Sequence, residues 1–478
     1  MRLGLAMLGS GLGLALLVGC ANGPLTPPYH RPPPPIPAAF PAGPAYGAQA
    51  PDAAPAPWRE VFVGAKLRGV IELALSQSRD LRVAVAQVSA AQAQFHTQRA
   101  ALLPAVNGTA SATYAREYSG LPPQYGAAYD RVTEYSVGGA VASYQVDLFG
   151  KIRSLTRAAF EQYLATAAGR RSEELTVIAG TATDWMTLAS DESLLKVSQT
   201  TLANGQSSLD LANARLNGGV GTALDVANAR TIVEQAKADI GRYTTQVAQD
   251  KNALDLIVGA SVPAALLPTD MDDPDARLPK VPGALTSAVL LARPDVIQAE
   301  DQLRAAKANI GAARAAFFPS ISLTSSGGTT TASLASLFAP GTAVWNFAPT
   351  ITVPIFEGGA NRAGLDYAKA QDRIAVAQYE KAVQTAFRET ADALAVQGVI
   401  TSRLSAQQGL VDAAADSLRL ATALYDRGQD TYLDVLTAQR TLYAAQQALV
   451  STQLIAADNI VTLYEVLGGG YGQGLRAP

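Results

Sequence analysis

Two long stretches without proline constrain the fold of this 478-residue chain more than any other feature. Gln124 to Val262 and Ile355 to Ala477 contain no proline and are rich in alanine, leucine, glutamine, arginine and glutamate. Proline breaks a helix interior and these other residues favour one, so both stretches predict very long helices. We expect outgoing helices at about 151–216 and 360–426, each roughly 100 Å long at 1.5 Å per residue.

Apolar residues recur every seven positions inside both stretches. A strict seven-residue repeat predicts left-handed helix packing with knobs-into-holes contacts. A second stripe runs beside the first at the end of the chain, which predicts a helix that packs on its hairpin partner and on a further neighbour. The repeating residues are Leu188, Leu195, Leu202, Leu209 and Leu216, then Leu404, Val411, Leu418 and Tyr425, and finally the pairs Val435/Leu436, Leu442/Tyr443 and Leu449/Val450.

The chain contains two copies of one unit. Leu216 to Arg230 matches Tyr425 to Arg440 at an offset of 209, with Gly219 on Gly428, Thr222 on Thr431 and Leu224-Asp225-Val226 on Leu433-Asp434-Val435. Arg99-Ala100-Ala101 matches Arg314-Ala315-Ala316 at an offset of 215. Matches in the same order along both halves indicate an internal duplication.

The repeated segment predicts a tight turn between two helices. Gly218-Gly219 and Gly428 supply residues for left-handed backbone at the end of the outgoing helix. Thr222 and Thr431 are suited to begin the return helix as N-caps, each with an aspartate, Asp225 or Asp434, three residues later. This spacing predicts a capping box in both copies and a structural role for both aspartates.

Polar and apolar residues alternate in four short segments that precede the long helices. We expect strands at 104–118, 132–147, 319–328 and 343–356, with surface loops at 119–130 and 328–340. The alternation fits membrane-spanning barrel strands, and it fits a soluble antiparallel sheet equally well. Four strands cannot close a barrel. Two copies would give eight strands and a filled interior, whereas three would give twelve and a lumen, which the polar face favours.

The first twenty residues have the layout of a secretory signal. Met1-Arg2 precedes an apolar run that ends before Cys20, the only cysteine. The site resembles a bacterial lipobox, which implies cleavage of 1–19 and acylation of Cys20; a plain secretory signal is the alternative. Ala21 stands where an aspartate would retain such a lipoprotein in the inner membrane. The resemblance therefore favours the outer membrane.

Thirteen of the 27 prolines lie between Pro24 and Pro57. Such a stretch cannot be helical, so we expect residues 20–63 to form an extended tether from the lipid anchor or a strap along the surface.

Composition argues against several classes of function. One cysteine and two histidines cannot form a disulfide framework and leave little for a zinc site. A formal charge of −3 gives no basic face for nucleic acid. No catalytic motif is present, and the acids Asp270, Asp272, Asp273 and Asp275 lack the spacing of metal ligands. We therefore expect no enzyme activity, no metal and no cofactor other than the lipid on Cys20.

Several motifs together resemble the TolC family of outer-membrane efflux ducts, in particular its OprM- and NodT-like lipoprotein branch. The resemblance implies a mainly α fold with a small β part: a trimer with a twelve-strand barrel and a twelve-helix tunnel. It divides the chain into a first repeat at 64–258, an equatorial linker at 259–282, a second repeat at 283–467 and a tail at 468–478. The motifs are the lipobox, Leu291 to Val296, Val146 to Gly150, Val353 to Gly359, Gly428 to Arg440 and Leu463 to Tyr471.

The resemblance also implies a function. Such ducts passively export small molecules, including drugs and toxic compounds, from an inner-membrane pump through the periplasm and the outer membrane. The expected partners are two further copies of the chain, a periplasmic adaptor and a pump of the resistance-nodulation-division class. The alternatives are a duct for a secretion system and a structural coiled-coil lipoprotein.

In this family the second hairpin closes the periplasmic end. Carried over by position, Asp434 occupies a carboxylate ring, Tyr425 is the tethering tyrosine and Arg440 is a candidate partner for a neighbouring chain. Thr437 stands where relatives can carry a second aspartate, so we expect at most one ring of three carboxylates. The competing explanation of Asp434 is the capping box.

Overall fold

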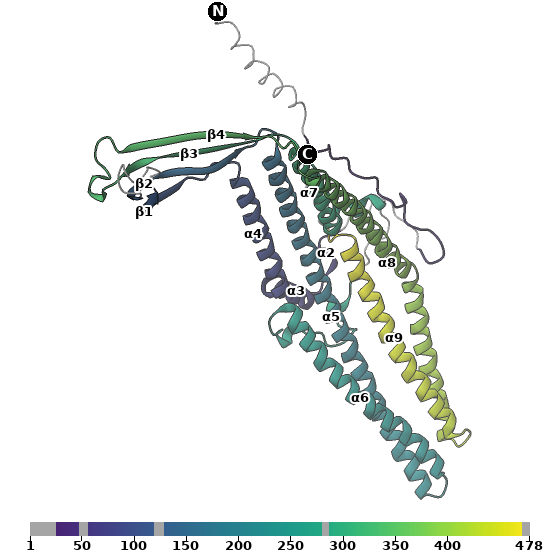
Figure 1. Ribbon diagram of the computed structural model, residues 1–478. Helices are drawn as coiled ribbons and strands as arrows, with labels where there is room; N and C mark the ends of the chain where they lie inside the picture. Colours follow the sequence, from purple (N-terminus) through teal and green to yellow (C-terminus); the bar gives the residue numbers. More distant parts are fainter. Residues whose placement is uncertain (1–24, 47–55, 119–128, 280–285, 471–478) are drawn as a thin grey trace, which may run out of the picture. The chain divides into compact units, whose positions relative to one another are not determined.

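The computed structural model describes residues 25–46, 56–118, 129–279 and 286–470 (Figure 1). The predicted signal 1–19, Cys20, residues 119–128, 280–282 and 471–478 lie outside the described residues. The chain forms two compact units, and each is described by itself. The first comprises Met1–Pro32, Ser89–Ala165 and Glu300–Gln378, and the second comprises Pro33–Val88, Thr166–Ala299 and Tyr379–Pro478.

The first unit contains one antiparallel sheet of four strands in the order β1-β2-β3-β4. The strands are β1 Asn107–Tyr118, β2 Tyr129–Val146, β3 Ser320–Thr331 and β4 Ala343–Thr352. β2 pairs with β3, so the hairpin from the first half of the sequence joins the hairpin from the second half. The sheet is therefore built from both copies of the duplicated unit.

The register assigns one polar and one largely apolar face to this sheet. Directly paired residues of antiparallel strands share a face, and Ser111 pairs with Ser136 while Ser322 pairs with Thr350. The alternation predicted from the sequence is confirmed. The polar face includes Asn107, Thr109, Ser111, Thr113, Ser136, Ser322, Thr324, Ser326, Asn346 and Thr350, and the opposite face includes Ala110, Ala112, Tyr114, Val137, Val141, Ile321, Leu323, Trp345, Phe347 and Ile351.

Four strand boundaries differ from the prediction by three residues or more. β1 begins at Asn107 and not at 104. β3 continues through Gly328–Thr331, which was expected in a loop, because Gly328 lies against the backbone of Gly138 at a distance that a Cβ would not allow. β4 ends at Thr352 and not at 356, since Pro354 has no N–H to donate to a ladder. β2 begins at Tyr129, inside the loop predicted at 119–130, because its ladder with β1 extends to Tyr118.

The long helices have the expected places. α5 (Lys151–Asn217) and α8 (Ala360–Asp426) contain 67 residues each, against predictions of 151–216 and 360–426. None of the helices in the described residues has a stretch long and apolar enough to cross a membrane. The other helices are α2 (Trp58–Val61), α3 (Ala65–Gln77), α4 (Arg79–Ala100), α6 (Ala223–Val258), α7 (Pro294–Ala315) and α9 (Tyr432–Val466), and the 3-10 turns are η2 (Ala264–Leu266), η3 (Pro274–Ala276), η4 (Ser287–Ala292) and η5 (Leu334–Ser336).

Narrow apolar seams hold the second unit together. α3 buries Leu67, Val70, Ile71 and Ala74, the spacing of one helical face. The indole N–H of Trp185 on α5 donates to the carbonyl of Leu266 at 2.9 Å. On α9 one predicted stripe, Leu436, Tyr443 and Val450, is buried, whereas Leu442 and Leu449 of the neighbouring stripe are only half-buried. The second stripe thus keeps apolar surface for a further contact.

Residues 25–31 form a strap on α7 in the first unit. The hydroxyl of Tyr29 and the guanidinium of Arg31 both donate to Glu300, at 3.0 and 2.7 Å. Arg314 donates to the carbonyl of Leu25 at 2.9 Å. In the second unit Phe40 stacks on Phe387 with ring centres 5.1 Å apart. Of the two possibilities raised by the prolines, the described residues form a strap.

Two carboxyl groups lie side by side between α5 and α6. Burial, together with the hydrogen bond and charge of Asp191 and the charge of Asp184, raises the pKa of Asp250 to about 7. Burial also raises the pKa of Asp191. In the unfolded chain an aspartate ionises near pH 4. At a pH between about 4 and 7, Asp250 is protonated in the folded chain and ionised in the unfolded chain, so unfolding releases its proton. The contribution of Asp250 to stability therefore falls as the pH rises from about 4 to 7.

We predict that Asp250→Asn raises the unfolding temperature at pH 8 and leaves it unchanged at pH 4. The amide has the shape of the protonated acid and never carries the buried charge. Thermal denaturation of the detergent-solubilised chain at both values measures the difference. Asp412→Asn, at an exposed aspartate of α8, is the control and should show no such pH dependence. An equal gain from Asp250→Asn at both pH values would contradict the prediction.

Candidate functional site at the hairpin turns

The two helical hairpins of the second unit end in the same turn. Gly219 and Gly428 have φ angles of 76° and 70°, in the left-handed region, whereas Gly218 does not. The N–H of Val220 donates to the carbonyl of Arg215, and the N–H of Gln429 donates to that of Leu424, each at 3.0 Å. The N–H groups of Gly219 and Gly428 donate to the carbonyls three residues earlier, of Leu216 and Tyr425. The two bonds together make each helix end a Schellman motif. The duplicated glycines therefore have the predicted role.

The start of α6 is the predicted capping box. The N–H of Asp225 donates to the hydroxyl of Thr222 at 3.1 Å, and the N–H of Thr222 donates to the carboxylate of Asp225 at 3.0 Å. Two backbone donors that the helix leaves without partners are thus satisfied. The role of Asp225 in the fold is to cap α6.

The start of α9 departs from this pattern, and the prediction of a second capping box is wrong. The side chain of Thr431 accepts no backbone hydrogen bond and donates its hydroxyl to Asp434 at 2.7 Å. The N–H of Thr431 donates to Asp430 at 2.8 Å. Asp430 stands where the first copy has Gly221, and it takes over the backbone contact that Asp434 was expected to make.

Asp434 therefore carries an exposed carboxylate next to a second acid. Its pKa is lowered by the hydrogen bond from Thr431 and then by the hydrogen bond with Asp430. The sequence analysis found no second acid, because Thr437 stands where relatives can carry one, and it missed Asp430. The difference between Gly221 and Asp430 at matched positions was the available signal.

Tyr425 lies in the contact between the two hairpins. Its ring is covered by the guanidinium of Arg215, with Cζ 4.2 Å from the ring centre, and it meets the ring of Tyr432 edge-on at 5.4 Å. Arg215 also donates to the backbone carbonyl of Tyr425 at 3.1 Å. A small apolar cluster from both hairpins surrounds these groups and consists of Ala212, Ala229, Ile232, Tyr425, Tyr432, Val435 and Leu436.

Further polar contacts join α9 to the first hairpin. Arg440, expected to face a neighbouring chain, donates to the hydroxyl of Thr231 on α6 at 2.9 Å. Gln439 donates to Ser208 on α5 at 2.9 Å. The structure thus brings Tyr425 and Arg440 to the same interface between the hairpins, while Asp434 and Asp430 lie at its exposed end.

A buried polar contact lies farther from the turns. The phenol of Tyr443 donates to Asp239 at 2.9 Å and lies 2.8 Å from the hydroxyl of Ser198. Burial raises the pKa of Tyr443 to about 12. Asp239 is 7% exposed and also accepts from Gln235 and Arg242, so its charge is fully compensated. This contact ties α9 to both helices of the first hairpin.

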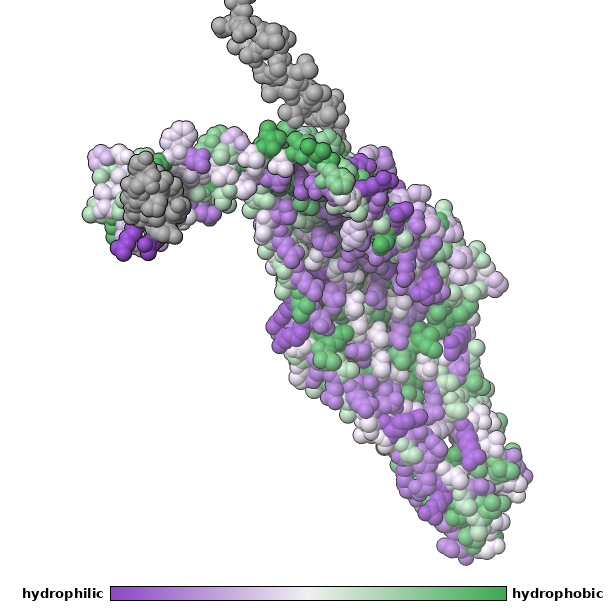
Figure 2. Space-filling view, viewed as in Figure 1, coloured by the Kyte–Doolittle hydropathy of each residue, from purple (hydrophilic) through white to green (hydrophobic). Residues whose placement is uncertain are grey.

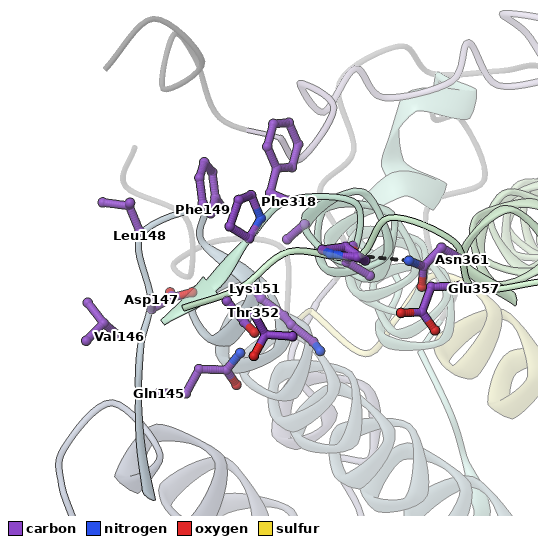
Figure 3. Close-up of a pocket in the computed structure, with 15 residues that line it drawn as sticks. Gln145, Val146, Asp147, Leu148, Phe149, Lys151, Phe318, Thr352, Glu357 and Asn361 are labelled. Carbon is purple, nitrogen blue, oxygen red and sulfur yellow. Dashed lines mark hydrogen bonds between the residues drawn. The ribbon is translucent and has the colours of Figure 1, made fainter. Parts of the chain in front are cut away.

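The motifs at the strand-to-helix corners have a structural role in the first unit. Asp147 accepts from the N–H groups of Ile152 and Arg153, at 3.0 and 2.9 Å, and so caps α5. Phe149 stacks on Phe318 with ring centres 4.7 Å apart, and the amide of Asn361 donates to the carbonyl of Ala316 (Figure 3). These residues surround a cavity of about 250 Å³. In the part of the chain that the structure describes, no three metal-ligating side chains converge.

Most of this chain is similar to known proteins of one family. The family model described as outer membrane efflux protein matches residues 70–260 and 285–469. The solvent efflux pump outer membrane protein SrpC of Pseudomonas putida is 43% identical over 462 residues, covering 96% of this chain and 97% of SrpC.

Solved structures agree with this similarity. A membrane protein from Pseudomonas aeruginosa superposes with a TM-score of 0.86 at 37% identity, covering 94% of this chain and 98% of its own. The open state of the Neisseria gonorrhoeae MtrE outer membrane channel gives a TM-score of 0.84 at 34% identity, with coverage of 95% and 99%.

We predict that Thr222→Ala and Thr431→Ala have unequal effects on their turns. Loss of an N-cap costs about 1 kcal/mol, which speeds local opening roughly fivefold. Thr222→Ala should therefore accelerate amide exchange at the start of α6 by about that factor. Thr431→Ala should change exchange at the start of α9 much less, because the backbone N–H of residue 431 still donates to Asp430. Hydrogen–deuterium exchange of peptides from the two turns measures both, and equal acceleration would contradict the asymmetry.

Proposed function

This chain belongs to the outer membrane efflux protein family, and from that membership we propose that it is the outer-membrane duct of a tripartite efflux system. In this role it performs no chemistry and passively conducts small molecules outward. The substrates come from an inner-membrane pump and pass through the periplasmic part of the duct. Solvents and antibiotics of low molecular mass are the substrate class we propose.

One observation supports the duct most directly: a two-faced sheet whose outer strands have room for further partners. In the described residues β1 and β4 each pair on one side only. Lipid offers no hydrogen bonds to an open sheet edge, so a membrane-spanning sheet has to close. On the apolar face Trp345, Phe347 and Ile351 are 82%, 58% and 57% exposed. Figure 2 shows the sheet surface with its mixture of apolar and polar residues.

Closure leads to a homotrimer. If β4 of one copy pairs with β1 of the next, three copies form a twelve-strand barrel with the serine and threonine face toward the lumen. Apolar corner residues then lie at the edge of the membrane: Ile355 and Phe356 are 94% and 88% exposed. The half-buried stripe of Leu442 and Leu449 on α9 supplies an apolar seam for the neighbouring helices.

The remaining parts of the proposal concern location and partners. A lipid on Cys20 would anchor the chain in the outer membrane, with the helical hairpins in the periplasm. A periplasmic adaptor and a pump of the resistance-nodulation-division class would complete the system. A secretion duct would share this fold, and a coiled-coil scaffold would share the helices but would have no need of the two-faced sheet.

Deletion of the gene tests the function. We predict that the deletion strain loses tolerance to solvents and antibiotics severalfold and that the intact gene restores it. Purified chain should form trimers and conduct ions in planar bilayers. Normal tolerance together with loss of a secreted protein would favour the secretion duct, and trimers that do not conduct would favour the scaffold.

The hairpin turns are the proposed periplasmic gate. Tyr425 and Arg440 hold the second hairpin against the first, and Asp434 presents an exposed carboxylate that accepts a hydrogen bond from the Thr431 hydroxyl. In a trimer the exposed acids of three chains would surround the mouth. Asp430 adds three carboxylates to the single ring expected from the sequence.

We predict that Asp434→Ala loosens the closed end and raises single-channel conductance, whereas Asp225→Ala mainly weakens its own hairpin. The two aspartates occupy matched positions, so the second variant controls for the loss of a carboxylate at a helix start. Recordings in planar bilayers compare them. Equal changes in conductance from both variants would remove the argument for a gate.

A further inference from the structure

A second cavity, of about 610 Å³, lies in the second unit away from the hairpin turns. α8 and α9 supply most of its wall, and the rest comes from Arg293, the first turn of α7 and one residue of α5. Neither the efflux duct nor the gate proposed above assigns a role to it.

The cavity is strongly acidic. Its charged groups are one guanidinium and five carboxylates, from Arg293, Asp295, Glu389, Asp392, Asp458 and Glu465. Arg293 is fully engaged: it donates to Asp295 at 2.8 Å, to Glu389 at 2.9 Å and to the carbonyl of Val466 at 3.0 Å. The ion pairs of Arg293 are thus made with Asp295 and Glu389.

Asp458 is the acid without compensation. Its Oδ1 atom is buried and has no hydrogen-bond partner, and burial raises the pKa of the carboxyl to about 6. Glu465 differs, since it accepts from Thr176 at 3.5 Å, and Asp392 differs, since it is exposed beside Arg388. A buried acceptor with no donor is costly, and native structures usually provide one.

Asn459 gives an independent indication in the same wall. Its side chain lines the cavity and is only 7% exposed. Asp458 and Asn459 thus present to one space a carboxylate whose Oδ1 has no partner and an amide. A ligand that carries N–H donors would satisfy both groups.

The rest of the wall narrows the class of ligand. Ala393, Val396 and Ile455 line the cavity beside these polar groups and offer an apolar surface. Hard divalent cations prefer six or more oxygen ligands, whereas one carboxylate and one amide suit an ammonium group on an apolar body. We propose that this cavity binds an organic ammonium ion, with Asp458 and Asn459 as its hydrogen-bond acceptors.

Binding of benzylammonium to the full-length protein in detergent tests the proposal. Benzyl alcohol has nearly the same shape and no charge, and titration into protein-free micelles corrects for partitioning. At pH 8, where Asp458 is ionised, isothermal titration should show saturable binding of benzylammonium that is at least about tenfold tighter than that of the alcohol. Equal affinity for the two probes, or no saturable binding, would overturn the proposal without any variant.

Two matched variants locate the site. Asp458→Asn should weaken benzylammonium binding about tenfold or more, whereas Asp392→Asn, at an exposed acid of the same cavity, should leave it within about twofold. Binding should also weaken below pH 6 as Asp458 takes up its proton, with Arg293, Asp295, Glu389, Asp392 and Glu465 as the other ionisable groups that face it. An unaltered affinity of Asp458→Asn, or equal losses from both variants, would refute this assignment.

Discussion

The contact of Tyr443 with Asp239 is the interaction on which the arrangement of the two hairpins depends. A buried carboxylate is tolerated only when hydrogen bonds replace its water, and Asp239 receives them from Gln235, Arg242 and Tyr443. Alanine-rich seams bury little surface per residue and would allow helices to slide along one another. A phenol that must reach one carboxylate fixes the register of α9 against α5 and α6, and with it the place where the two turns meet.

Both hairpins have the same glycine turn, but only the first has the capping box at the start of its return helix. Both Schellman motifs retain their backbone hydrogen bonds, because each has a glycine, Gly219 or Gly428, at the position that requires left-handed backbone. At the next element the copies differ, since Asp430 replaces Gly221 and takes the N–H that a capping aspartate would hold. A single substitution beside an unchanged Thr-x-x-Asp motif thus replaces the reciprocal capping box, and Asp434 keeps the contact with the Thr431 hydroxyl. Duplicated folds can acquire separate duties by such small local changes.

Local and periodic features of this fold were predictable from the sequence. The helix limits follow from proline and glycine, and the two faces of the sheet follow from a period of two. Contacts between distant segments were not predictable. Arg293 was visible only as part of a motif, although its guanidinium holds the end of α9 through Val466. Asp458 showed no pattern, because the lack of a partner for its Oδ1 depends on which helices enclose it. The second capping box was predicted wrongly since Asp430 competes for the same N–H.

The hydrogen bonds that α9 makes to the first hairpin differ in their burial. Tyr443 and Asp239 are bonded in a buried setting, Gln439 and Ser208 in a partly buried one, and Arg440 and Thr231 at an exposed site. Hydrogen bonds near solvent contribute less net free energy than those that replace lost hydration inside. The hydrogen bond of Tyr443 to Asp239 therefore contributes more net free energy than those of Gln439 and Arg440, while a buried apolar cluster around Tyr425 and Tyr432 holds the helices next to the turns. Asp434 lies outside both contacts, at the exposed start of α9, so a change of its charge can alter the turn without disturbing the register that Tyr443 sets.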